Sequence, residues 1–523
     1  MLTLLLTATL LVGAPLSAVS TEDPARPDWP RTRAERTENQ ETSTLADVED
    51  FIAQLIARGA PIRRETLGIS AENREIPLVI CADPMVASGA EARATGRLVI
   101  YLQANIHGGE IEGKEVVQML LRELAAGVHP QWLTRCVFVC TPIYNTDGNE
   151  AWGPGLENRA HQNGPPIVGR RPNGQGLDLN RDCMKASSPE MRAALTGVYR
   201  HWDPHVVLDL HTTNGTRHGY SLTYAPPLHP DTDPEVLDFA REQLLPEVRR
   251  RLKEQHGELT NDYGNVQIVN EARGWGTFSP LGRYVSNYAG LRGRIGVLSE
   301  ATSFLPLETR IRSTKRFVTQ VLNVCTEQAG TVAAVCRAAD ARGREGSTET
   351  LSLKTTLAAR GEEAVPLERK GEERAAHESP GVIVEATMPI YDRFVPTRSD
   401  PVPRAYWIPA AESEVIALLR RHGIEVEPCR WSRVPTMEAF TPDEVRGQRT
   451  FQGVRMRRLS GNWAEQAITL EDARRGYTVS MRQPLARLIF HLLEPESGDG
   501  VIAWGMVRGA VEANETTPIR RVR

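Results

Sequence analysis

The chain has 523 residues, and its 62 Lys and Arg against 66 Asp and Glu give a formal net charge of −4. This near-neutral balance excludes a strongly basic nucleic-acid binder and a polyacidic tail protein. Seven Cys are too few for a disulfide-built scaffold, and the length predicts two or three domains.

The N-terminal segment 1–20 is an apolar run that ends in small residues, with Ala18 and Ser20 just ahead of Thr21. This pattern predicts a secretory signal peptide, and hence a secreted or periplasmic protein, although no Lys or Arg precedes the run. No later segment approaches 18 uncharged apolar residues. We therefore expect no membrane span once the signal peptide is removed.

The rest of the chain divides by composition. Apolar runs alternate with helical patterns from about 66 to 330, which predicts an α/β domain over residues 21–340. Residues 341–380 are polar and charged, as in a linker. Residues 381–523 contain the strand-like runs GVIVEAT, YTVSM and ARLIFHLL with one helix near 411–422, which predicts a smaller β-rich domain.

A candidate metal site begins after the first buried strand, Leu98 to Leu102. The loop that follows it carries His107 and Glu110, separated by two glycines that let the backbone turn tightly. His-x-x-Glu in such a loop can bring an imidazole nitrogen and a carboxylate onto one ion. Alone, the pair is weak evidence, because it arises often by chance.

Two more candidate groups also follow apolar strands. His211 ends the run HVVLDLH, and Glu300 ends the run GRIGVLSE. Ligands of open α/β sheets bind at the carboxyl ends of the strands, so the shared position favours one site. His107, Glu110 and His211 supply two nitrogens and one carboxylate, which is the composition of a catalytic zinc site with an open position. Glu300 can then serve as the general base.

A loop rich in arginine adds candidate anion-binding groups. It carries Arg159, Arg171 and the pair Asn180 and Arg181. A guanidinium can bind a carboxylate in bidentate fashion, and a second one can stabilise an oxyanion. Arg is frequent in this chain, so each of them taken alone is more simply a solvated loop residue.

Together these features resemble the zinc carboxypeptidases, over about residues 66–325. The resemblance rests on five motifs in order and spacing: HGGE at 107–110, NTDG at 145–148, LDLNRD at 177–182, DLHTT at 209–213 and NYAGLRGRIGVLSE at 287–300.

The resemblance implies a mixed eight-stranded sheet with helices on both faces, one Zn²⁺ per chain, and a peptide substrate with a free C-terminal carboxylate. His107, Glu110 and His211 match the zinc ligands, and Glu300 matches the general base. Asn180 and Arg181 match the pair that binds the terminal carboxylate of the substrate. Arg171 is the match for the arginine that stabilises the oxyanion, with Arg159 as the alternative.

The chain departs from the family where a mobile tyrosine is expected. Tyr284 and Tyr288 are available there, and neither is a secure match. The floor of the specificity pocket would fall near Arg283, which predicts a preference for an acidic terminal side chain. The sequence gives no indication of oligomeric state.

Three rival functions use the same residues. A deacylase of the succinylglutamate desuccinylase and aspartoacylase type shares the zinc site and carries similar motifs, but the insertion at 149–179 favours the peptidase. An amidase acting on cell-wall peptides would suit an exported protein. A carboxypeptidase-like binding protein without activity is disfavoured, because all three ligand positions and the base position are filled.

Overall fold

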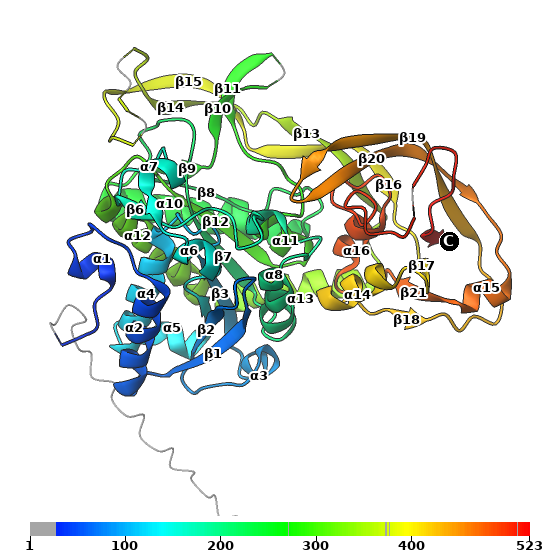
Figure 1. Cartoon of the computed structure of the whole chain (residues 1–523), viewed down its shortest axis with the longest axis horizontal. Coiled ribbons are helices and arrows are strands. Elements are labelled where there is room, and N and C mark those ends of the chain that lie inside the picture. Colours follow the sequence, from blue (N-terminus) through cyan, green and yellow to red (C-terminus); the bar gives the residue numbers. More distant parts are fainter. Residues whose placement is uncertain (1–27, 270, 372–373, 376, 510) are drawn as a thin grey trace, which may run out of the picture.

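The computed structural model describes residues 28–269, 271–371, 374–375, 377–509 and 511–523, and the predicted signal peptide at 1–20 lies outside them (Figure 1). At its centre is an eight-stranded mixed sheet with helices on both faces, which confirms the predicted fold. In spatial order its strands are β1 (Ile62–Ile69), β2 (Glu75–Cys81), β4 (Cys136–Thr141), β3 (Leu98–Ala104), β7 (Val206–Thr212), β12 (Ile295–Ala301), β8 (Leu222–Ala225) and β9 (Thr260–Asp262).

The middle of the sheet is parallel and buried on both faces. β4, β3, β7 and β12 pair in parallel, and every residue of β3 and β7 is buried. Successive side chains of a strand point to opposite faces, so Leu98, Ile100 and Leu102 enter one apolar core while Val99 and Tyr101 enter the other. This two-sided burial explains why these strands are continuous apolar runs.

One face of the sheet is covered only by helices from residues 33–345, the N-terminal part of the chain. The longest of these helices, α12, packs against α4 and α10. The helices and short elements of this part are α1 (Arg33–Arg36), α2 (Leu45–Ala57), α4 (Glu112–Ala125), α5 (Pro130–Arg135), α6 (Thr146–Glu150), β5 (Gly153–Pro154), α7 (Gly155–Asn158), β6 (Ile167–Val168), α9 (Pro234–Asp238), η3 (Phe239–Leu244), α10 (Leu245–His256), α12 (Leu307–Glu327) and α13 (Ala329–Glu345).

The other face is shared with the C-terminal region. α11 lies on β7 and β12, and the core beneath it continues into Tyr406, Leu418 and Phe490 of the C-terminal region. One continuous apolar core therefore joins the C-terminal strands to the central eight-stranded sheet. The elements of the N-terminal part that lie on this face are α3 (Gly89–Ala94), η1 (Leu179–Arg181), α8 (Pro189–Ala194), η2 (Leu195–Arg200) and α11 (Val285–Leu291).

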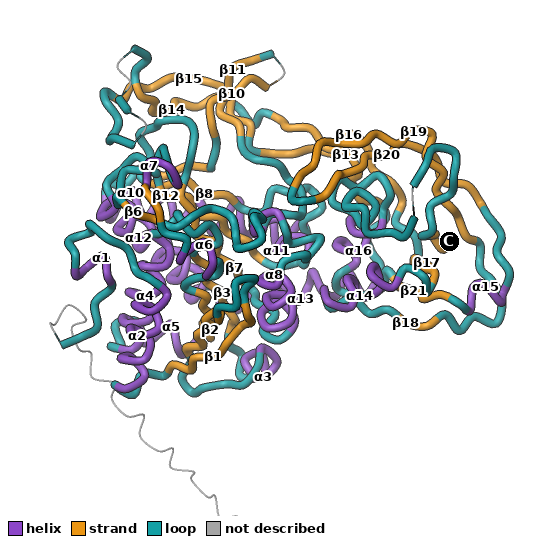
Figure 2. Tube along the Cα trace, viewed as in Figure 1, coloured by secondary structure: helices purple, strands orange, loops and turns teal. Residues whose placement is uncertain are grey.

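The C-terminal region is rich in strands, as Figure 2 shows. A four-stranded sheet runs β10 (Asn265–Val269), β11 (Ala272–Gly276), β15 (Ile383–Tyr391), β14 (Glu362–Glu368), and thus combines strands from both parts of the chain. The ribbon β13 (Thr350–Ala358) and β16 (Arg393–Pro401) leads to a six-stranded sheet with three helices. These are β18 (Glu427–Pro428), β21 (Gly476–Ser480), β17 (Ala405–Pro409), β22 (Arg520–Val522), β19 (Met437–Phe451) and β20 (Val454–Glu465), with α14 (Ser413–His422), α15 (Leu470–Arg474) and α16 (Ala486–Leu493).

Two sequence predictions differ from the structure here. The segment 341–380, predicted as a linker, contains β13 and β14. In β14 the buried residues Val365 and Leu367 alternate with the more exposed Ala364, Pro366 and Glu368. The run ARLIFHLL, predicted as a strand, is helix α16. It is buried almost all round, so its sequence shows no periodicity that could separate a helix from a strand.

Among the described residues, no helix is both long and apolar enough to cross a bilayer.

Candidate functional site

Three candidate ligands converge at the carboxyl ends of β3 and β7. The Nδ1 atom of His107 lies 2.9 Å from Oε1 of Glu110, and Nδ1 of His211 lies 2.9 Å from Oε2 of the same carboxylate. The two Nδ1 atoms are 3.2 Å apart. All three side chains are buried. Figure 1 shows β3 and β7 side by side in the middle of the sheet.

The loop that carries two of these ligands is built around Asn105 and Gly108. Asn105 adopts a left-handed backbone conformation, and its side-chain amide donates to the carbonyls of His107, Gly108 and Glu110. A Cβ atom on Gly108 would lie 2.1 Å from the carbonyl carbon of Gly148. Gly108 is therefore needed because the backbone of Gly148 packs closely against it. The sequence predicted only that the glycines allow a tight turn.

The far nitrogen of each imidazole faces a carboxylate. His107 Nε2 lies 3.0 Å from Asp178, and His211 Nε2 lies 2.7 Å from Asp209. A carboxylate there holds the proton on Nε2 and leaves the Nδ1 lone pair free for a metal. The sequence interpretation assigned no role to Asp178 or Asp209. Asp209 precedes His211 by two residues on one strand face, which is a readable signal.

This donor set fits zinc. Ligand atoms about 2.0–2.1 Å from a tetrahedral zinc are roughly 3.3 Å from one another, close to the separations of 2.9–3.2 Å found here. Two imidazoles and one carboxylate leave a fourth position open, as in catalytic zinc sites.

A second group of possible ligands among the described residues is His229, Asp231 and His491. The Asp231 carboxylate accepts hydrogen bonds from Ser352 and lies 2.7 Å from His491 Nε2, and His229 Nδ1 accepts from the Asp231 backbone. These contacts account for the cluster without a metal.

Glu300 lies beside the candidate ligands. β12 pairs with β7 so that Glu300 is opposite His211, and both side chains point to the face that carries α11. Burial raises the pKa of Glu300 to about 8 in the metal-free protein, while the positive charge of His211 acts in the opposite direction. No described residue is hydrogen-bonded to the carboxyl, which leaves it open to a substrate or water.

A pocket of about 120 Å³ connects these groups to the arginines of the 159–181 loop. Arg171 lies 3.2 Å from Glu110 and forms an ion pair with Asp178. Burial acts to raise the pKa of Asp178, but the charges of His107 and Arg171 hold this pKa well below its usual value. The lining residues are His107, Glu110, Arg171, Asn180, Arg181, His211, Thr212, Asn214, Tyr263, Phe278, Tyr284, Ser286, Leu298 and Glu300.

The predicted substrate-binding residues take different places. Arg181 and Asn180 line the pocket, and the Arg181 guanidinium lies 4.3 Å from the ring centre of Tyr284. Arg159 does not line it; its guanidinium reaches Glu110 at 2.9 Å and donates to the carbonyl of Thr212. Arg159 therefore contacts the candidate ligand from outside the pocket, and Arg171 is the one of these two arginines that lines it.

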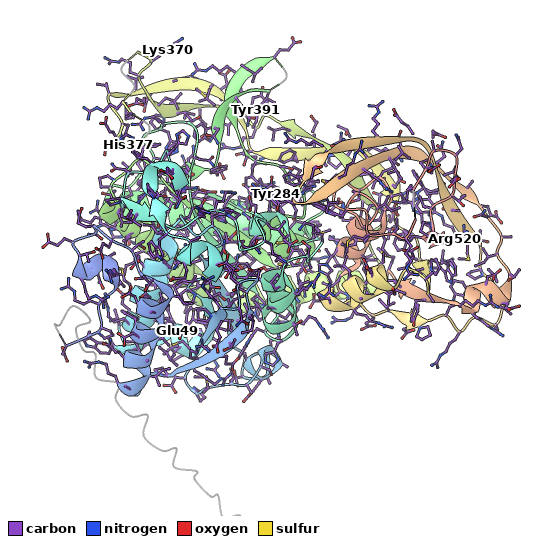
Figure 3. All side chains as sticks on the ribbon, in the orientation of Figure 1. Glu49, Tyr284, Lys370, His377, Tyr391 and Arg520 are labelled. Carbon is purple, nitrogen blue, oxygen red and sulfur yellow. The ribbon has the colours of Figure 1, made fainter. Side chains whose placement is uncertain are left out.

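The structure does not bring Tyr288 or Arg283 into the pocket. The ring of Tyr288 is fully buried, and its hydroxyl lies 2.7 Å from Nδ1 of His422. The guanidinium of Arg283 pairs with Asp499 at 2.6 Å and lies over the ring of Trp504. Both side chains bind residues of the C-terminal region, and the motifs gave no sign of these contacts. In Figure 3, Tyr284 lies between the catalytic part and the strands β19 and β20.

Comparison with known proteins agrees with the site. Residues 48–279 match the family model of the zinc carboxypeptidases. The chain is 22% identical to Carboxypeptidase 2 of Trichophyton rubrum over 507 residues, and the match covers 91% of this chain and 86% of the relative. It is also 22% identical to Carboxypeptidase 2 of Trichophyton equinum, with coverage of 87% of this chain and 81% of the relative.

Similar solved structures include a metallo-carboxypeptidase from Burkholderia cenocepacia, with 15% identity, a TM-score of 0.41, and coverage of 54% of this chain and 69% of that one. Carboxypeptidase A of Helicoverpa armigera has 13% identity, a TM-score of 0.41, and coverage of 56% and 75%. The family match and the curated relatives confirm the predicted resemblance and the predicted zinc cofactor, and they support a zinc metallopeptidase similar to carboxypeptidases.

Proposed function

We propose that the protein removes the C-terminal residue of peptides, with Glu300 as general base and with His107, Glu110 and His211 as the zinc ligands. One observation carries this proposal: the three ligands, Glu300 and Arg181 all open into one pocket. Zinc held there supplies a Lewis acid and lowers the pKa of water.

Glu300 takes the proton of the attacking water and later delivers it to the amine that leaves. Its carboxyl suits this role because it is half-buried, lines the pocket and is not hydrogen-bonded to any described residue. Arg171 stabilises the negative charge that develops on the carbonyl oxygen. Asp178 holds Arg171 through two nitrogens, so the guanidinium is oriented before substrate binds.

Arg181 and Asn180 hold the terminal carboxylate of the peptide. The Arg181 side chain has one donor on the carbonyl of Asn180 and stacks on Tyr284, which leaves its remaining donors available to a carboxylate. Asn180 is less free, because its side-chain oxygen accepts from the Val285 amide. Tyr284, of the two candidate tyrosines, is the one that lines the pocket.

The test is mass spectrometry of peptides with free and amidated C-termini, incubated with the zinc-loaded protein. We expect loss of single C-terminal residues from free-acid peptides only. Glu300→Gln should lower kcat about 10³-fold with zinc content unchanged, and Arg181→Gln should raise KM. Substitution of the exposed His161 by Ala is the control, with unchanged rates.

Equal cleavage of amidated peptides would contradict the assignment of Arg181. Cleavage of N-acyl amino acids with intact peptides would assign the protein to the deacylases, and cleavage of cell-wall peptides alone would make it an amidase. Zinc binding without any cleavage would indicate a binding protein.

We further propose that residues 21–340 are the catalytic domain and 381–523 a C-terminal domain that shapes the cleft. Gln452, at the tip of the β19–β20 hairpin, accepts a hydrogen bond from the Asp178 amide. Gln452→Ala should raise KM severalfold for peptides while the thermal midpoint stays unchanged. An unchanged KM would contradict this role.

Export of the protein is a separate proposal, supported by the composition of residues 1–20. The intact mass of the chain recovered outside the producing cell should correspond to a start at Thr21. A mass that retains residues 1–20 would contradict it.

A further inference from the structure

A cavity of about 380 Å³ lies outside the catalytic pocket. α10 and η3 form one side, β8 and β9 another, and the turn between β15 and β16 a third. Tyr391, labelled in Figure 3, pairs with Gly276 of β11 just before this turn. The lining residues are Tyr224, Ala225, Pro226, Leu228, Arg241, Glu242, Leu245, Pro246, Arg249, Arg250, Lys253, Asp262, Tyr263, Thr277, Arg360, Asp392 and Arg393.

The walls carry six cationic side chains against three carboxylates. We call this space the cationic cavity. Arg360 and Arg393 already hold all three acids: Arg360 pairs with Asp262 and Asp392, and Arg393 pairs with Glu242. The positive charge that remains is therefore not balanced by the lining carboxylates.

Three of the six cations form no ion pair with any described residue. Arg241 and Lys253 form no ion pair with a described residue, and Arg249 is hydrogen-bonded to the hydroxyl of Tyr224. Arg250, in contrast, is occupied by Glu247 and Glu254 at the surface. Arg241, Arg249 and Lys253 thus offer donors to a ligand.

Arg241 also lies in an unfavourable electrostatic environment. Burial and the neighbouring Arg393 lower the pKa of Arg241, and the charges of Asp392, Glu242 and Asp262 offset only part of this effect. Arginine does not shed its proton in proteins, so the cost of this charge persists until an anion compensates it. Guanidinium groups match the geometry of carboxylate and phosphate oxygens.

A thin wall separates the cationic cavity from the catalytic pocket. Tyr263 lines both spaces, Thr277 faces the cavity, and its neighbour Phe278 faces the pocket. Tyr263 and Phe278 are in edge contact, with ring centres 5.9 Å apart. A peptide that occupies the pocket is therefore within a few side-chain lengths of the cavity.

We propose that the cationic cavity is an anion subsite that binds a carboxylate or phosphate group through Arg241, Arg249 and Lys253. The anion is carried either by an acidic residue of the peptide substrate or by a free multivalent anion. The first source rests on the proposed peptidase function, and the second does not.

The first test is calorimetric titration of the zinc-loaded protein with inorganic pyrophosphate. We expect saturable binding that falls at least about tenfold in the double variant Arg241→Gln with Arg249→Gln. The control is Arg251→Gln, which removes one positive charge from α10, as Arg249→Gln does, but at a guanidinium that is held by Glu247 and Glu327 outside the cavity. Lys253→Gln, at an exposed position, should weaken binding severalfold without a risk to folding.

The catalytic arginines must be excluded as the binding site. Pyrophosphate binding should persist in Arg181→Gln. Absence of binding to the wild type, equal binding by the double variant and Arg251→Gln, or loss of binding only in Arg181→Gln would each overturn the proposal.

The second test identifies the source of the anion. Peptides with Glu upstream of the cleaved bond are compared with Gln counterparts. If the double variant lowers kcat/KM for the Glu peptides alone, the cavity binds the substrate. If it loses pyrophosphate binding while the Glu-to-Gln ratio stays the same, the ligand is a free anion. Because pyrophosphate binding needs no turnover, failure of the peptidase assignment would leave this result intact.

Discussion

Around the candidate metal ligands, Arg159 and Arg171 lie within 3.2 Å of Glu110, and each ligand imidazole faces a carboxylate. Across Tyr263, in the cationic cavity, Arg241 and Lys253 form no ion pair with a described residue. The pocket gathers lone pairs and is arranged to hold a metal cation, whereas the cavity gathers unpaired cations and is arranged to hold an anion. Two neighbouring spaces can thus bind ligands of opposite charge, because carboxylates surround the metal ligands in one, whereas cations outnumber carboxylates in the other.

The largest effect should come from removing a metal ligand. His211→Ala leaves one imidazole and one carboxylate, too few to hold zinc, so the metal content after dialysis should fall below a tenth of an atom per chain and peptide hydrolysis should fall more than about 10³-fold. Metal analysis by mass spectrometry checks this, with His161→Ala as control. Zinc retained in His211→Ala would mean that the metal is held elsewhere.

Next in size is the packing of the ligand loop. Gly108→Ala forces a Cβ to within 2.1 Å of the Gly148 backbone, so we expect a loss of about 3 kcal/mol in the free energy of unfolding. Gly330→Ala is the matched control, because nothing lies within 4 Å of its added Cβ. Equal stability of the two variants in urea titrations would show that the loop tolerates the clash.

The carboxylates behind the imidazoles should have a smaller effect. Asp209→Asn removes the charge that holds His211 in its metal-binding tautomer, so zinc affinity should fall 10- to 100-fold. Competition with a calibrated chelator measures this. An affinity within twofold of the wild type would mean that Asp209 serves only the packing of β7.

The smallest predicted effect concerns pH and the cationic cavity. Burial and the nearby Asp392 raise the pKa of Asp262 to about 6, so the folded protein binds this proton more tightly than the unfolded chain. The stability that Asp262 contributes is therefore present at low pH and lost as pH rises through about 6. Between pH 5 and 7 the loss should be about 1 kcal/mol.

This effect is isolated by comparison with Asp262→Asn. The difference in unfolding free energy between the two proteins should depend on pH over this range. A constant difference from pH 5 to 7 would show that Asp262 is ionised throughout.

The two regions also differ in how far their sequences predicted them. The central strands and the candidate ligands were predicted because two-sided burial produces unbroken apolar runs, and polar residues such as His211 and Glu300 stand at their ends. Asp209 and Asp178 both lie within the motifs. The spacing of two residues between Asp209 and His211 on β7 could be read from the sequence, whereas contacts such as that of Asp178 with His107 depend on how the chain returns to the sheet. Such contacts become visible only in the fold.

The C-terminal region was harder to predict because tertiary contacts decide its structure. α16 is buried almost all round, so its apolar run was taken for a strand. β14 is an edge strand that accommodates Pro366, and its charged residues were taken for a linker. Arg283 was predicted to face a substrate, but Asp499, 216 residues away in the chain, binds it instead.

The most direct test of the catalytic centre is a crystal structure of Glu300→Gln with zinc and an uncleaved free-acid peptide, recorded at the zinc absorption edge. We predict one anomalous peak between His107, Glu110 and His211, with the peptide carboxylate on Arg181. A peak at His229, Asp231 and His491, or a peptide carboxylate bound away from Arg181, would contradict the account.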